Sequence, residues 1–93
     1  MALLATSAGV GAAESLPVPI KRQAVKSTSL ASMGYNEPAR ALELEFRTGA
    51  IYRYEAVPPI VFEEMLKAAS KGRYFSEKVR GKFRFQQLRE PKR

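Results

Sequence analysis

The clearest pattern in the chain is the alternation of apolar and polar residues in ALELEF, residues 41–46. On an extended chain, its leucines and phenylalanine fall on one face and its two glutamates on the other. Such alternation is typical of a strand with one buried face. Residues 50–54, AIYRY, are rich in β-branched and aromatic residues. They predict a second strand beside the first.

The turn RTG, residues 47–49, connects these two strands. A two-residue loop would place Leu44 opposite Arg53 and mix polar with apolar residues on both faces. A three-residue loop with Gly49 in the left-handed conformation keeps the faces separate. The pairs it predicts are Phe46–Ala50, Leu44–Tyr52, Leu42–Tyr54 and Glu43–Arg53.

Before this hairpin, residues 24–30, AVKSTSL, are rich in β-branched and hydroxyl residues and predict another strand. The following stretch MGYNEP, residues 33–38, contains Gly, Asn and Pro and predicts a turn. Three strands that follow one another in this way form an antiparallel meander.

Two helices are expected after the hairpin. Residues 57–72, VPPIVFEEMLKAASKG, have apolar residues at helical spacing, with Pro59 in the first turn and Gly72 as the stop. Ser76 is expected to cap a second, shorter helix, which Gly81 weakens. The sequence therefore predicts an α+β fold, a three-stranded antiparallel meander followed by two helices packed on one face (β-β-β-α-α).

The expected domain occupies residues 24–85. Residues 1–23 are rich in small residues, with Lys21 as the first lysine, so they lack the basic start of a signal peptide. Their apolar part is also too short to span a bilayer. We expect a flexible N-terminal tail at 1–23, a frayed basic C-terminal tail at 86–93, and a cytoplasmic protein without a membrane role.

The composition excludes several classes of chemistry. The 93 residues include no His and no Cys, and all nine acidic residues are Glu. A disulfide framework, an ordinary zinc site and a Ser-His-Asp or Cys-His mechanism are therefore excluded. A Ser–Lys pair such as Lys26 with Ser29, or the two carboxylates of Glu63 and Glu64, would remain for an enzyme, but neighbouring residues do not face each other. We predict no catalysis, no metal and no cofactor.

Charge gives the first functional indication. The net charge is +7, and residues 72–93 alone hold eight cationic residues against two glutamates. Such asymmetry favours a polyanionic partner, although a solvated basic helix is the plainer interpretation. The candidate phosphate-binding residues are Lys71, Arg73, Lys78, Arg80, Lys82 and Arg84.

Aromatic residues offer a second set of candidates. Tyr52 and Tyr54 share one face of their strand, where they could stack on bases. That face also carries leucines, so packing in the core is the favoured interpretation. Lys26, Tyr35 and Tyr74 are further candidates for contact with an anion or a base.

From Val25 to Phe85 the chain resembles the KTSC domain family, named after C-terminal extensions of lysyl-tRNA synthetases and also found as small bacterial proteins. The resemblance is carried by the order and spacing of KSTS, GY, LELEF, the Gly49 turn, YRY, VPP, AASKG and YFSEKVR. The family is recognised by its Tyr-x-Tyr, here Tyr52 and Tyr54. Asn36 departs mildly from it, since Asp is more frequent there.

The family's function is undetermined, but its association with a synthetase suggests RNA binding. Aminoacylation does not carry over, because the chain has no synthetase catalytic domain. We therefore expect a small non-enzymatic nucleic-acid-binding module, favouring RNA, that uses its basic C-terminal face. The alternative is a protein-interaction module or homodimer that uses an exposed sheet edge and has no nucleic-acid role.

Overall fold

The computed structural model describes residues 19–92. Its elements are β1 (Gln23–Ala24), β2 (Leu30–Asn36), β3 (Ala41–Phe46), β4 (Ile51–Tyr54), α2 (Pro59–Lys67), α3 (Lys71–Tyr74), the π-helical turn η1 (Phe75–Val79) and β5 (Phe85–Arg89). The strands form one antiparallel sheet in the order β1-β2-β3-β4-β5. The α+β class is confirmed, but the sheet has five strands where the sequence predicted three.

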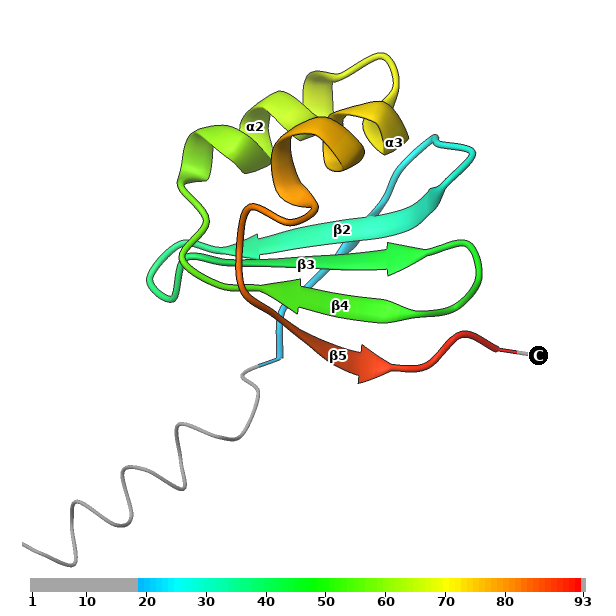
Figure 1. Cartoon of the computed structure of the whole chain (residues 1–93), viewed down its shortest axis with the longest axis horizontal. Coiled ribbons are helices and arrows are strands. Elements are labelled where there is room, and N and C mark those ends of the chain that lie inside the picture. The colour runs from blue at the N-terminus through cyan, green and yellow to red at the C-terminus, as the bar shows by residue number, and fades with distance from the viewer. Residues whose placement is uncertain (1–18, 93) are drawn as a thin grey trace, which may run out of the picture.

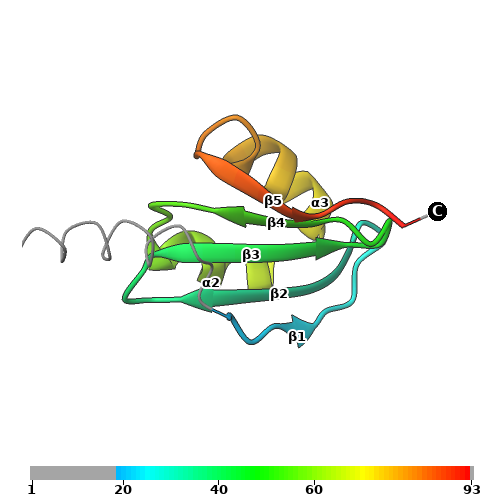
Figure 2. The same ribbon diagram turned by 90° about the horizontal axis from the view of Figure 1, so that it is seen from below.

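The helices lie on one face of the sheet, and the other face is seen in the view from below (Figures 1 and 2). The core fills the space between sheet and helices. Its buried residues come from β2, β3, β4, the β4–α2 connection, α2 and η1. They are Leu30, Met33, Leu42, Leu44, Tyr54, Val57, Met65 and Val79.

The β3–β4 hairpin has the predicted register. Leu44 pairs with Tyr52, and the Leu42–Tyr54 and Glu43–Arg53 pairs follow. The Phe46 amide donates to the carbonyl of Ala50 at 2.8 Å, which closes the three-residue loop. Gly49 has a φ of 97°, the left-handed conformation that this loop requires.

The strand predicted at residues 24–30 is wrong for most of its length, because β2 begins only at Leu30. The Ser27 hydroxyl accepts hydrogen bonds from the amides of Ser29 and Leu30, both at 3.1 Å, and this local turn interrupts the extended chain. The turn predicted at residues 33–38 is also displaced. β2 continues to Asn36, whose side chain accepts a bond from the Ala39 amide within the turn that follows.

Gly34 lies inside β2 because another segment crosses it. A Cβ atom there would overlap the carbonyl oxygen of Lys21 and lie 3.1 Å from the Cα of Arg22. The glycine that suggested a turn therefore allows the segment before β1 to lie against the sheet.

Gly34→Ala is expected to destabilise the protein by about 1–3 kcal/mol, the usual cost of overpacking a buried site. The obstructing atoms belong to the backbone and cannot rotate away. Urea unfolding followed by circular dichroism would measure the change. Gly81→Ala is not a neutral control because Gly81 has a φ of 76°. Ser76→Ala, at an exposed position in η1, is the better one. An unchanged midpoint for Gly34→Ala would contradict the close approach of Lys21.

The helical region also differs from the prediction. α2 ends at Lys67, before the expected stop at Gly72, which lies within α3. Ser70 caps α3 by accepting a hydrogen bond from the Arg73 amide at 3.2 Å, whereas Ser76 lies inside η1 and caps nothing. The prediction of two helices is confirmed, but their boundaries were wrong, because the chain leaves the first helix at Ala68 and Ser70 already caps the next one before Gly72.

The frayed tail expected at residues 86–93 is wrong for the first four of them, which belong to β5. β5 pairs with β4, and a bulge inserts one extra residue between Gln87 and Arg89. This bulge moves Arg89 to the face opposite that of Gln87. Most of the N-terminal tail expected at residues 1–23 lies outside the described residues, but Gln23 already belongs to β1.

Candidate nucleic-acid interface

The basic residues that follow α2 are mostly exposed and unpaired. In the region from residue 19 to residue 92, none of the six candidate cations takes part in an ion pair. Lys71 is half-buried, and its Nζ atom donates to the Ala68 carbonyl at 3.1 Å. The other five are exposed; they are Arg73, Lys78, Arg80, Lys82 and Arg84.

A groove of about 580 Å³ opens beside these cations. It lies where β4 and β5 meet η1 and the β3–β4 loop. Arg80 and Arg47 line it together with Gly81 and Ser29. Its aromatic lining residues are Phe46, Tyr52, Tyr54, Phe75 and Phe85. Lys82 and Arg84 line a second hollow with Glu55 and Phe83, so cations of one connection face both depressions.

The aromatic rings of the groove contact one another. Tyr52 and Phe85 lie 5.5 Å apart between ring centroids, and Tyr54 and Phe85 lie 5.6 Å apart. Phe75 joins the cluster through edge contacts with Phe46 at 5.2 Å and Tyr54 at 5.8 Å. Such contacts fix the positions of the rings and pre-form the groove wall.

The two tyrosines of the Tyr-x-Tyr segment differ in their surroundings. Tyr54 is 5% exposed and belongs to the core, as the favoured interpretation expected. Burial raises its pKa to about 12, with Tyr52 adding to the rise and Arg80 opposing it. Tyr52 is half-buried, and its hydroxyl accepts a hydrogen bond from Gln87 Nε2 at 3.1 Å. Both side chains also line the groove, so packing and ligand contact are not exclusive here.

Tyr35 and Tyr74 are not exposed stacking platforms. The Tyr35 hydroxyl donates to the Val57 carbonyl, and its ring stacks on Phe62 at 5.4 Å. Tyr74 donates to Glu64 Oε1 at 2.8 Å; burial, followed by this bond, raises its pKa to about 12. Among residues 19–92 the exposed aromatic side chain is Phe85, at 56%. The sequence did not indicate it as a site residue because the other four residues of its strand were taken for a tail.

Lys26 is exposed and has no hydrogen bond to Ser29 among the described residues. Ser29 instead approaches α3, where a Cβ added to Gly72 would lie 2.6 Å from its hydroxyl oxygen. The two residues therefore do not form the catalytic pair that the sequence left open. Within residues 19–92, no three His, Cys, Asp or Glu side chains gather to hold a metal ion.

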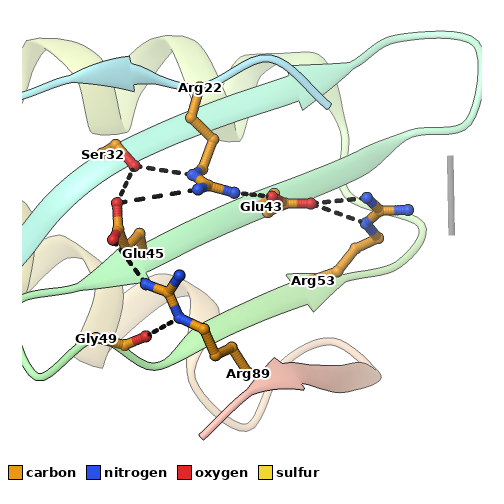
Figure 3. A network of polar contacts seen from close by, with 7 residues as sticks. All are labelled: Arg22, Ser32, Glu43, Glu45, Gly49, Arg53 and Arg89. Carbon is orange, nitrogen blue, oxygen red and sulfur yellow. Dashed lines mark hydrogen bonds and ion pairs between the residues drawn. The ribbon is translucent and has the colours of Figure 1, made fainter. Parts of the chain in front are cut away.

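A network of ion pairs lies on the opposite face of the sheet (Figure 3). The sequence predicted its Glu43–Arg53 pair but not the contacts of Arg22, Ser32 and Arg89. Glu43 is 4% exposed; Arg22 Nη1 pairs with its Oε2, and Arg53 Nη2 with its Oε1 at 2.7 Å. Ser32 Oγ donates to Glu45 Oε1 at 2.8 Å, and Arg89 Nη2 pairs with Glu45 Oε2 at 3.0 Å. These three arginines come from distant segments of the sequence, and each forms an ion pair with Glu43 or Glu45 within the fold.

The contribution of Glu45 to the stability of the fold depends on pH. The hydrogen bond from Ser32 is the main cause that lowers its pKa from the ordinary value of 4.5, and the Arg22 and Arg89 charges act in the same direction against desolvation. A lowered pKa stabilises the fold above the unfolded value, and this stabilisation is lost as pH falls through the folded value. We expect Ser32→Ala to reduce the loss of stability below about pH 4.5. Thermal unfolding at pH 7 and pH 3 would test this; an identical pH dependence in both proteins would contradict it.

The fold and its surfaces define a class: a small α+β domain with an antiparallel sheet covered on one face by helices, and a basic edge beside an aromatic groove. The KTSC domain model matches residues 26–83, well over half of the chain. The protein belongs to the KTSC domain family.

Two comparisons agree with this assignment. An uncharacterized protein of Stutzerimonas stutzeri is 52% identical over 58 residues, which cover 62% of this chain and 82% of that protein. The crystal structure of a KTSC domain protein from Yersinia pestis superposes with a TM-score of 0.73 at 35% identity. The superposition covers 76% of this chain and 100% of the Yersinia chain.

The chain is also similar to part of a larger protein. A lysine–tRNA ligase of Nostoc punctiforme is 43% identical over 54 residues, which are 58% of this chain and 10% of the ligase. The similarity thus concerns one region of that enzyme. In the region from 19 to 92, no helix is long and apolar enough to cross a membrane.

Proposed function

We propose that this protein is a non-enzymatic module that binds nucleic acid, with RNA favoured over DNA, and contacts phosphates with the cations of residues 73–84. One observation carries the proposal. Arg22, Arg53 and Arg89 each form an ion pair with a buried or half-buried glutamate, whereas the five exposed cations from Arg73 to Arg84 have no acidic partner among the described residues. Unpaired cations gathered on one segment are suited to a polyanion.

Arginine and lysine have complementary uses at such a surface. The guanidinium groups of Arg80 and Arg84 can hold a phosphate in two parallel hydrogen bonds. The ammonium groups of Lys78 and Lys82 act as point charges. Contacts of this kind position a nucleic acid without reading its sequence, so we expect affinity that depends weakly on base sequence.

RNA is favoured because a similar region occurs within a lysine–tRNA ligase. A region of the Nostoc lysine–tRNA ligase is similar to 54 residues of this chain, and that enzyme's name connects it with tRNA. A module joined to such an enzyme can increase the affinity of the enzyme for RNA without taking part in catalysis. The same module alone would serve as a small RNA-binding protein.

Fluorescence anisotropy with labelled single-stranded RNA tests the proposal. We expect binding that weakens steeply between about 50 and 200 mM salt, with a log–log slope near −0.7 for each phosphate contacted. A DNA oligomer of the same sequence provides the comparison for the preference. Absence of binding to either oligomer at low salt would contradict the proposal.

The second candidate function is a protein interface at the sheet edge. β5 lies at one edge of the sheet and carries Phe85, which is 56% exposed. An exposed apolar side chain on an edge strand can pair with a second copy or another chain. Sedimentation equilibrium over a range of concentrations distinguishes the two candidates. A dimer mass that Phe85→Lys abolishes, without any RNA binding, would favour the interface.

A further inference from the structure

We propose that the groove between β4, β5 and η1 binds an unpaired base of single-stranded RNA, stacked against Phe85 and hydrogen-bonded by the Tyr54 hydroxyl. This inference rests on the proposed function and adds to it a specific site and a specific ligand, a nucleotide whose base is free of a pairing partner. The phosphate-binding cations alone would not distinguish single strands from duplexes.

The stacking surface is built by Phe85. Its ring is held against Tyr52 and Tyr54 at 5.5 and 5.6 Å, yet 56% of the residue remains exposed. A ring that is fixed from behind and open in front loses little freedom when a base packs on it. Every base has a flat face, so stacking tolerates any sequence but requires the base to be unstacked from a duplex.

The hydrogen-bonding group is the hydroxyl of Tyr54. Its side chain lines the groove and is 5% exposed, and the hydroxyl has no hydrogen-bond partner among residues 19–92. The hydroxyls of Tyr35, Tyr52 and Tyr74 all have partners in the protein. A tyrosine hydroxyl carries its proton at neutral pH, and burial, the largest cause, raises the pKa of Tyr54 further, from 10.0 to about 12. The hydroxyl can therefore donate to a carbonyl oxygen or ring nitrogen of a base.

Charge selects a nucleotide over an uncharged aromatic ligand. Arg80 and Arg47 line the same groove, and both are exposed. Arg47 Nε is engaged by the Ser27 carbonyl at 2.9 Å, whereas Arg80 has no side-chain hydrogen bond among the described residues. With a base on Phe85, Arg80 is placed for its phosphate. The groove volume of about 580 Å³ lies within the range of small-ligand sites.

Two variants isolate the proposed contacts with little change to the fold. Phe85→Leu keeps an apolar side chain on β5 but removes the flat ring, and Tyr54→Phe removes only the unpartnered hydroxyl. Affinity for a single-stranded RNA of about ten nucleotides should fall about 5- to 150-fold for Phe85→Leu. It should fall about fivefold for Tyr54→Phe, the usual effect of one neutral hydrogen bond. Tyr74→Phe, which removes the hydroxyl of a tyrosine that does not line the groove, is the matched control and should bind like the wild type.

An abasic oligomer of the same length separates this inference from the proposed function. It presents the same phosphates without bases, so the wild type should bind it more weakly, and the two groove variants should bind it as well as the wild type does. If RNA and abasic oligomer bind equally, or if neither groove variant weakens RNA binding, the inference is overturned while the phosphate contacts stand. If the wild type binds no oligomer at low salt, both proposals are overturned.

Discussion

Changing Lys78, Arg80, Lys82 and Arg84 together to glutamine is expected to remove most of the salt-dependent affinity for single-stranded RNA. These side chains are exposed and have no ion-pair partner among the described residues, so their loss should leave the core intact. The log–log salt slope should become shallower by about 0.7 for each side chain that contacts a phosphate. Anisotropy titrations at several salt concentrations would measure the two slopes.

The control for this variant has the same net charge. Changing four exposed cations elsewhere to glutamine also lowers the charge from +7 to +3; they are Lys21, Lys26, Arg40 and Lys67. If the cations of residues 73–84 form the site, this control should keep nearly the wild-type slope. Equal losses in both variants would mean that overall charge, and not this surface, attracts the RNA.

Glu43→Ala is expected to cost about 3 kcal/mol of unfolding free energy, the low end for breaking a buried pair. The glutamate is 4% exposed and forms ion pairs with both Arg22 and Arg53, whose side chains are 24% and 11% exposed. Its removal leaves Arg53 with a poorly solvated charge and releases Arg22 from the sheet. Partial exposure of Arg22 keeps the loss below the upper end of that range. Urea unfolding followed by circular dichroism would measure it.

Glu63→Ala provides the comparison for this change. Glu63 is exposed on α2 and takes part in no ion pair among the described residues, so its removal should change stability by less than about 0.5 kcal/mol. Similar losses for the two variants would contradict a structural role for the Arg22–Glu43–Arg53 cluster. RNA binding should survive in any Glu43→Ala protein that remains folded, since the cluster lies on the opposite face from the groove.

The hairpin was predictable because its information is local. Strict alternation in residues 41–46, together with Gly49 in the loop, is enough to define the register, including the Glu43–Arg53 pair. The charge of the C-terminal region was also evident, and the exposed positions of Arg80, Lys82 and Arg84 agree with it. Composition and alternation indicate which side of a strand or helix is buried and which is exposed, and the sequence predicted these features.

The segments that were predicted wrongly depend on contacts between residues that are distant in the sequence. Gly34 indicates a turn when considered alone, but the segment at Lys21 crosses it. β5 has weak alternation because its bulge places Gln87 and Arg89 on opposite faces. Without β5 in the prediction, neither the exposed ring of Phe85 nor the groove could be anticipated. The Arg22–Glu43 pair joins residues 21 positions apart beside β1, a two-residue strand too short to predict.

A ¹H–¹⁵N chemical-shift titration of the labelled protein with single-stranded RNA would locate the RNA-binding surface directly. We expect the largest changes in residues 73–85 and in β4, with small changes in α2 and β1. Saturating changes confined to α2 or to the Glu43 face, or no changes at low salt, would contradict this expectation.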